Sequence, residues 1–253
     1  MKIVSILGMG LLLLTACQSN PTITSHRQLA IVKEKGVVIP QETQQLLKVV
    51  TKDWDAKEGV LQRYERDQNS SWHKVGQAIE VILGRNGLGW GRGLHTIPKD
   101  AKYIKQEGDG KAPAGLFVLG HGFGYQKFES DFPYTQYRQT DHCVDDSHSQ
   151  WYNQIVDSTK IKKDYKSFEH MKLKNNLYEY GITVEHNPQA IANAGSCIFV
   201  HIRNHSGKGT AGCTAMDKDK IVEILKWLKE EKKPLLLQLP QEELKKIHDD
   251  SLK

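Results

Sequence analysis

Several features that would assign the chain to a common functional class are missing from its sequence. The formal net charge is only +5 over 253 residues, and the lysines are scattered, so there is no basic stripe of the kind that binds nucleic acid. Internal repeats are absent. The one glycine-rich stretch, 84–93, lacks the Gly-Lys-Ser/Thr ending of a phosphate-binding loop. A hydrophobic content of 38% and a charged content of 26% remain typical of a folded domain rather than a disordered chain.

The N-terminus predicts export. Lys2 precedes the apolar run 3–14, which is too short for a stable membrane span, and Leu-Thr-Ala then precedes Cys17. This ending resembles the bacterial lipobox, which implies cleavage after residue 16 and acylation of Cys17; the alternative is an ordinary signal peptide with an incidental cysteine. Gln18, rather than Asp, follows the cysteine and favours an outer-membrane anchor facing the periplasm. Residues 17–44 are polar, contain two prolines and predict a tether.

From residue 45 to residue 240 the pattern predicts one mostly-β domain with a few short helices. Strands are expected at 46–51, 60–66, 75–83, 114–119, 182–186, 197–202 and 234–239. A short helix is expected at 167–173 and a longer one at 217–231, with Asp217 as its N-cap. The tail 241–253 is expected to be a short charged helix. The glycine-rich stretch is interpreted as a tight structural loop with Trp90 against the core.

Export changes the interpretation of the remaining cysteines. Cys143, Cys197 and Cys213 would lie in an oxidising compartment, where one disulfide leaves one cysteine over. The leftover cysteine is either reactive or intermolecular, and the residues alone do not decide which cysteine it is.

The densest chemical signal is His201, at the end of an apolar strand, followed by Thr210-Ala211-Gly212-Cys213. A cysteine nucleophile needs a base within reach, and Gly212 permits a tight turn that leaves the sulfur open. Backbone N–H groups of the turn and the N-terminus of the following helix could stabilise negative charge. The alternative is that Cys213 is a structural disulfide partner and His201 a core residue.

Over residues 45–239 the chain resembles the L,D-transpeptidase (YkuD-type) catalytic domain. That family carries a histidine on a strand, a loop and then Ser/Thr-x-Gly-Cys, which His201, Thr210, Gly212 and Cys213 match in order. The resemblance implies a β-sandwich or barrel with a C-terminal helix. Three further stretches resemble one branch of the family: Val-Ile-Leu-Gly-Arg-Asn-Gly at 81–87, Lys-Gln-Glu-Gly-Asp-Gly-Lys-Ala-Pro-Ala-Gly at 105–115, and Cys-Val-Asp-Asp at 143–146.

The resemblance implies an enzyme that acts on peptidoglycan stem peptides without a metal or organic cofactor. Cys213 would attack the diaminopimelate carbonyl, release D-alanine and form a thioester, while His201 moves the proton and Gly212 helps build the site. The family's histidine before Gly-Cys is Ala211 here, and its Arg or Asn two residues after the cysteine is Ala215. These departures leave the acceptor open: an amine for transfer, or water for L,D-carboxypeptidase activity.

Other assignments follow from the resemblance or compete with it. Cys143 and Cys197 become the natural disulfide pair; the competing pair, Cys197 with Cys213, would silence the enzyme. Thr210, Arg203, Asp145, Asp146 and Tyr152 are candidates for contacts with substrate. A zinc site among the histidines lacks any tight ligand spacing. A non-catalytic peptidoglycan-binding lipoprotein is the alternative from another class, and a cysteine endopeptidase is disfavoured because the histidine precedes the cysteine.

Overall fold

The computed structural model describes residues 36–68, 70–247 and 252. The expected signal peptide, Cys17 and the tether up to residue 35 lie outside the described residues. The described part is mostly β with a few short helices, so the predicted fold class is confirmed. No helix in this part of the chain has the length and apolarity needed to cross a membrane.

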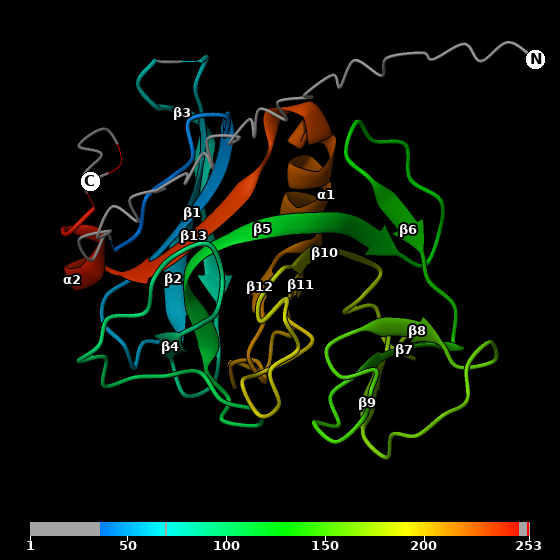
Figure 1. Cartoon of the computed structure of the whole chain (residues 1–253). Helices are drawn as coiled ribbons and strands as arrows, with labels where there is room; N and C mark the ends of the chain where they lie inside the picture. Colours follow the sequence, from blue (N-terminus) through cyan, green and yellow to red (C-terminus); the bar gives the residue numbers. More distant parts are fainter. Residues whose placement is uncertain (1–35, 69, 248–251, 253) are drawn as a thin grey trace, which may run out of the picture. The chain divides into compact units, whose positions relative to one another are not determined.

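The strands of the main sheet close on themselves (Figure 1). Following the ring, the order is β10-β11-β12-β3-β2-β1-β13-β5, and β5 pairs again with β10. The bounds are β1 Gln45–Thr51, β2 Glu58–Glu65, β3 His73–Ile82, β5 Ala112–Gly124, β10 Tyr180–Val184, β11 Phe199–Ile202, β12 Thr214–Met216 and β13 Leu235–Pro240. The short strands β4 (Leu88–Trp90) and β6 (Tyr134–Gln136) attach to β5.

Most expected strands are present within a few residues of their predicted bounds, because their apolar residues fill the core. Leu46, Leu47 and Leu237 are fully buried in the ring. The glycine-rich loop contains β4, and Trp90 packs in the core with 5% of its surface exposed, as predicted. The strand expected at 114–119 is longer than predicted and runs from Ala112 to Gly124.

A second, three-stranded sheet forms between residues 141 and 170, where the sequence predicts no strand (Figure 1). Strands β7 (Asp141–Val144), β8 (Ile155–Asp157) and β9 (Phe168–His170) pair in the order β8-β7-β9. The helix predicted at 167–173 is therefore wrong. Phe168 to His170 are extended because their backbone groups pair with β7, a partner more than twenty residues away in sequence.

Strands β10 to β12 separate two hydrophobic clusters. Val200 and Ile202 of β11 belong to the large core, together with Ile221, Ile224 and Leu225 of helix α1 (Lys218–Trp227). Phe199 belongs to a smaller cluster with Cys143, Cys197 and Cys213. Since side chains alternate across a strand, His201 lies on the same face as Phe199. The candidate residues therefore lie on the face turned away from α1.

Both ends of the described chain pack on the domain. Val37 and Thr43 are buried, and the Arg66 guanidinium donates hydrogen bonds to the carbonyls of Pro40 and Thr43. Residues 36–44, expected to be the end of the tether, therefore belong to the folded unit. After Pro240 the helix α2 (Gln241–Leu244) is short, and Leu244 and Ile247 are buried. The described part of the predicted charged tail is attached to the core.

Candidate functional site

The turn that carries Cys213 is fixed by its own polar groups. The Thr210 hydroxyl donates to the Cys213 carbonyl at 2.6 Å and accepts the Gly212 N–H at 3.2 Å. Backbone bonds to the residues after β3 hold the turn from outside: Thr210 N–H donates to Leu83 and its carbonyl accepts from Arg85. Gly212 is closely packed, since a Cβ there would lie 3.0 Å from the Lys111 carbonyl. Thr210 and Gly212 therefore shape the turn.

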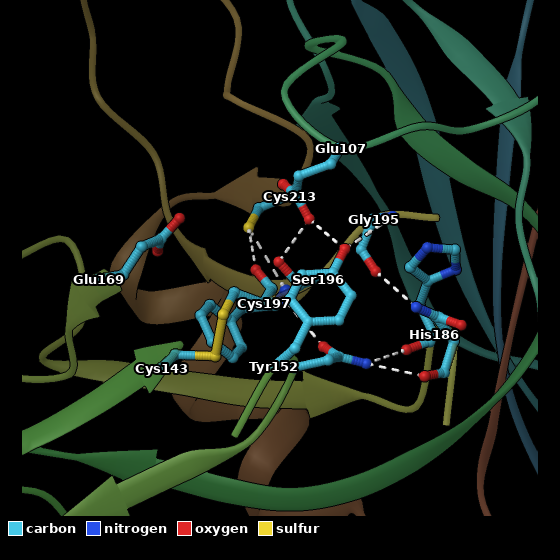
Figure 2. The surroundings of a disulfide bond; sticks show 12 residues. Glu107, Cys143, Tyr152, Glu169, His186, Gly195, Ser196, Cys197 and Cys213 are labelled. Carbon is cyan, nitrogen blue, oxygen red and sulfur yellow. Dashed lines mark hydrogen bonds between the residues drawn. A yellow bond between two sulfur atoms is a disulfide. The ribbon is translucent and has the colours of Figure 1, made fainter. Parts of the chain in front are cut away.

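The Cys213 sulfur is enclosed by the backbone of the segment before β11. The Phe199 N–H donates to Sγ at 3.4 Å, and the thiol donates to the Cys197 carbonyl at 3.6 Å (Figure 2). Cys213 is 5% exposed. Burial raises the pKa of the thiol well above its usual range, and the nearby Glu169 carboxyl raises it further. The resting sulfur is thus a neutral thiol rather than a thiolate.

The sequence suggested that the N-terminus of the following helix could stabilise a Cys213 thiolate, but the helix does not follow the cysteine directly. Strand β12 intervenes between the cysteine and α1, a distance of about 10 Å at the usual rise per strand residue. The N-cap residue Asp217 also makes no side-chain bond to its helix. The hydrogen-bond donor to the sulfur is instead the Phe199 N–H.

His201 has one ring nitrogen fixed by the backbone. Its Nδ1 atom lies 2.8 Å from the Ile202 carbonyl oxygen, which can only accept, so Nδ1 carries the proton. Burial lowers the pKa of His201 to about 4, which keeps the ring neutral at physiological pH. In a neutral ring with a protonated Nδ1, the lone pair is on Nε2. His201 therefore has the tautomer and charge state of a base.

Cys213 and His201 lie on the same face of neighbouring strands. His201 pairs with Ala215 in the parallel register of β11 and β12, and Cys213 is two residues before Ala215. Such diagonal neighbours lie about 7 Å apart at their backbones, within reach of a histidine ring. No hydrogen bond joins the two side chains among the described contacts; apo sites often tighten such bonds only with substrate.

The remaining two described cysteines are joined to each other. A disulfide links Cys143 of β7 to Cys197, as expected from the resemblance, and Cys213 is the free cysteine of the described residues. Cys197 has a φ of 55° and donates its N–H to the Asn153 side chain at 2.9 Å. The hydrogen bond to Asn153 and the disulfide, which Figure 2 shows beside Cys213, together fix the segment whose carbonyl faces the Cys213 thiol.

Glu169 and Tyr178 form a buried pair beside this sulfur. The Tyr178 hydroxyl donates to Glu169 at 2.5 Å, and the Tyr178 ring packs edge-on against His201 with 5.2 Å between centroids. Burial raises the pKa of Glu169 to about 6. Glu169 pairs with Cys143 in the register of β7 and β9, so the disulfide also holds this carboxyl in place.

A second carboxylate, Glu107, lies on another side of Cys213 (Figure 2). Its Oε2 atom accepts hydrogen bonds from the hydroxyls of Tyr152, at 2.5 Å, and Ser196, at 2.7 Å. Tyr152 is 2% exposed and its oxygen also accepts the Gly195 N–H. Tyr152, predicted to contact substrate, has its hydroxyl engaged in holding Glu107 and the 195–196 backbone.

The other predicted substrate residues differ in their availability. Arg203 forms a two-point ion pair with Asp217, and Asp146 accepts the N–H groups of His148 and Lys166 in a turn, so both have structural partners. Asp145 is different, because its buried Oδ1 has no hydrogen-bond partner in the described structure. No group of three or more His, Cys, Asp or Glu side chains in the described part could hold a metal ion.

Several residues near the sulfur were not predicted from the sequence. Glu107 lies in the stretch 105–115, which was noted only for its family resemblance. Glu169 lies in the segment expected to be a helix, and Tyr178 lies in a segment without a predicted element. Lys105 reads as one of the scattered surface lysines, yet its side chain is 3% exposed and ion-paired with Asp109. Only the long-range strand pairs and the disulfide bring these groups to Cys213.

Comparison with known proteins adds no family assignment. No protein-family model matches the chain, and no curated protein matches it at a significant level.

Proposed function

We propose that the chain is a peptidoglycan acyl transferase of the L,D-transpeptidase (YkuD) type. The observation that carries this proposal is that the structure holds a free cysteine and a neutral histidine on one face of the sheet. Cys143 and Cys197 are used in a disulfide, which leaves Cys213 free on the same sheet face as a neutral histidine whose Nδ1 is fixed by a carbonyl. A free thiol beside a histidine with an available Nε2 is the arrangement that cysteine acyl transfer needs.

The proposed reaction starts from the neutral pair. The Cys213 thiol attacks the diaminopimelate carbonyl of a stem peptide, and His201 Nε2 takes the thiol proton as the S–C bond forms. The C–N bond to D-alanine then breaks, and His201 returns the proton to the leaving amine. A thioester remains on Cys213. An acceptor amine attacks this thioester, gives its proton to His201, and the thiol is regenerated as the sulfur leaves.

The proposed substrate and location are those implied by the resemblance. The partners are peptidoglycan stem peptides and, through a lipid on Cys17, a membrane of the cell envelope. Water in place of the amine would make the protein an L,D-carboxypeptidase. A non-catalytic peptidoglycan-binding lipoprotein is the second candidate, and the observation in its favour is the burial and neutral state of the Cys213 thiol.

A carbapenem tests the proposal directly, because its strained amide resembles an acyl donor of this family. We expect intact mass spectrometry to show a stable adduct on the wild-type protein, mapped by peptide sequencing to Cys213. Cys213→Ala should give no adduct. His201→Gln, which keeps a polar side chain of similar size, should slow adduct formation by roughly 10²- to 10⁴-fold, the usual contribution of a general base.

A correctly folded wild-type protein without adduct, and without D-alanine release from a stem tetrapeptide, would overturn the enzyme proposal. The same protein that still binds the tetrapeptide would then be the non-catalytic lipoprotein. Equal adduct formation by His201→Gln would remove His201 from the mechanism while leaving Cys213 as the nucleophile.

A further inference from the structure

A cavity of about 340 Å³ lies on the same sheet face as Cys213, next to the disulfide. Phe199 pairs with Thr183 of β10 in register, and its N–H donates to the Cys213 sulfur on its other side. Cys213, Phe199 and Thr183 therefore follow one another across the sheet. Thr183 and Phe199 line the cavity, as do Cys143 and Cys197. The cavity thus begins at Cys197 and Phe199, whose backbone groups contact the sulfur, and extends to Thr183. Thr183 lies two strands away from Cys213, which is about 10 Å at the usual spacing of strands.

The inner wall of the cavity is a connected set of hydrogen-bonding groups. The His121 Nε2 lies 2.7 Å from the Tyr137 hydroxyl, and its Nδ1 lies 3.3 Å from the Thr183 hydroxyl. The His121 N–H also donates to Thr183 at 2.9 Å. Burial lowers the pKa of His121, so this wall is neutral. Gln154 adds an amide from the second sheet.

Glu185 supplies the single charge of the cavity lining. The lining histidines His121 and His186 are neutral because burial lowers the pKa of each, and Tyr137 is neutral because burial raises its pKa. Glu185 is exposed, follows β10 directly, and points its carboxylate over Gly120 near the Thr183 hydroxyl, since a Cβ on Gly120 would approach both oxygens. The cavity therefore offers one carboxylate for a cation and, in the Gln154 side chain, a neutral amide that can donate to an anion.

We propose that this cavity binds the ammonium and carboxylate groups at the end of the diaminopimelate side chain of the acyl donor. The inference rests on the proposed function, because Cys213 must hold the carbonyl of that same residue. Glu185 accepts from the ammonium group, and the Gln154 amide donates to the carboxylate. From the reacting carbonyl the side chain extends roughly 7 to 8 Å to its ammonium nitrogen, from ordinary bond lengths. That reach, added to the bond to sulfur, matches the two-strand separation.

Binding to the Cys213→Ala protein, which cannot react, tests the proposal by titration calorimetry. The probe is the stem tetrapeptide with diaminopimelate at its third position. A matched peptide carries norleucine there and so lacks both end groups. Glu185→Gln keeps the shape of the side chain and removes its charge; Glu231→Gln, on the exposed 3₁₀ helix Glu230–Lys232, is the control.

We expect Glu185→Gln to weaken binding of the diaminopimelate peptide by about 10-fold or more, the usual loss for a hydrogen bond to a charged group. The norleucine peptide should bind equally well to the Cys213→Ala protein with and without Glu185→Gln. Glu231→Gln should change the binding of neither peptide. Equal affinity of the two peptides for the Cys213→Ala protein, or no effect of Glu185→Gln, would overturn the assignment of the cavity.

The two proposals can fail separately. Carbapenems lack the diaminopimelate end group, so formation of the carbapenem adduct by the wild-type protein tests the enzyme proposal without involving the cavity. An adduct on Cys213 together with an unaffected peptide affinity overturns only the cavity proposal. Absence of the adduct, with peptide binding that still depends on Glu185, overturns the enzyme proposal and supports the cavity as a binding site.

Discussion

An ammonium group that barely reaches solvent lies close to Cys213. Lys105 donates to the Gln106 carbonyl and to Asp109, each at 2.6 Å, and its stem passes near Gly212, where a Cβ would lie 3.7 Å from Lys105 Cε. Its positive charge lowers the pKa of the Cys213 thiol, although burial and Glu169 raise it more. The Phe199 N–H and Lys105 are therefore the two nearby groups that favour the thiolate state formed during the proposed reaction.

Replacing Lys105 with methionine should make the thiol harder to ionise. We expect Lys105→Met to slow alkylation of Cys213 by iodoacetamide several-fold at pH 8, because the thiolate is the reacting form. The rate is followed by mass spectrometry of the Cys213 peptide. Lys226→Met, an exposed position on α1, is the control and should behave as wild type. A rate for Lys105→Met equal to that of the control would show that the Lys105 charge does not act on the sulfur.

The sequence predicted the centre of the site better than its surroundings. Cys213, His201 and the Thr210 turn belong to one short stretch of sequence. They lie close together because the strand that carries His201 pairs with the strand that follows Cys213. Glu169 and Tyr178 reach the sulfur only through the register of β9 and the packing of the second cluster. No spacing along the chain encodes such contacts, which explains why these residues were not predicted.

At the scale of elements, the three-stranded sheet is attached to the ring by the Cys143–Cys197 disulfide. The disulfide connects residues 54 apart in sequence. It holds both the Cys197 carbonyl and, through β9, the Glu169 carboxyl near Cys213. The position of this small sheet therefore decides the surroundings of the candidate nucleophile.

Removing the disulfide should destabilise the protein and loosen the site. For a loop of this length, chain entropy predicts a loss of about 4 kcal/mol in the free energy of unfolding. We expect a Cys143→Ser, Cys197→Ser double variant to show this loss in urea denaturation. Cys213 should become more reactive toward iodoacetamide in it, since its two backbone contacts relax. Cys213→Ala, with the disulfide intact, serves as the control for stability. Unchanged stability of the double variant would show that β7 to β9 are held by packing alone.

Strands were predicted correctly where the apolar pattern of the local sequence matches the burial of the strand in the fold. The runs 46–51 and 234–239 are apolar and lie at the centre of the ring, so their burial is visible in the sequence. The segment 128–174 carries short strands of three or four residues, whose extended state depends on distant partners. The expected helix at 167–173 failed for that reason: pairing with β7 outweighs local propensity.

At the scale of the molecule, two buried neutral histidines link stability to pH. Burial lowers the pKa of His186 to about 3 and of His201 to about 4, against 6.5 for an exposed histidine. At pH values between the folded and the unfolded pKa of each histidine, the unfolded chain binds more protons than the folded protein. The stability that these neutral histidines contribute is therefore complete above pH 6.5 and is lost as the pH falls toward 4. Glu169, whose pKa is raised to about 6, acts in the opposite direction by a smaller shift.

We therefore expect the free energy of unfolding to fall by a few kcal/mol between pH 7.5 and pH 5, measured by urea denaturation at each pH. Glu169→Gln removes the opposing carboxyl and should make the fall steeper. A free energy of unfolding that stays constant over this range would show that the imidazoles are not neutral in the folded protein.

The pairing of β1 with β13 has a consequence for the order of events during synthesis. The first strand of the ring, Gln45–Thr51, has β2 on one side and Leu235–Pro240 on the other. Strand β13 is made after every other strand of the ring, and it also pairs with β5. The ring therefore cannot close during synthesis until residue 240 has left the ribosome, and Thr214, directly after Cys213, gains its hydrogen bond to the Gln238 side chain only then.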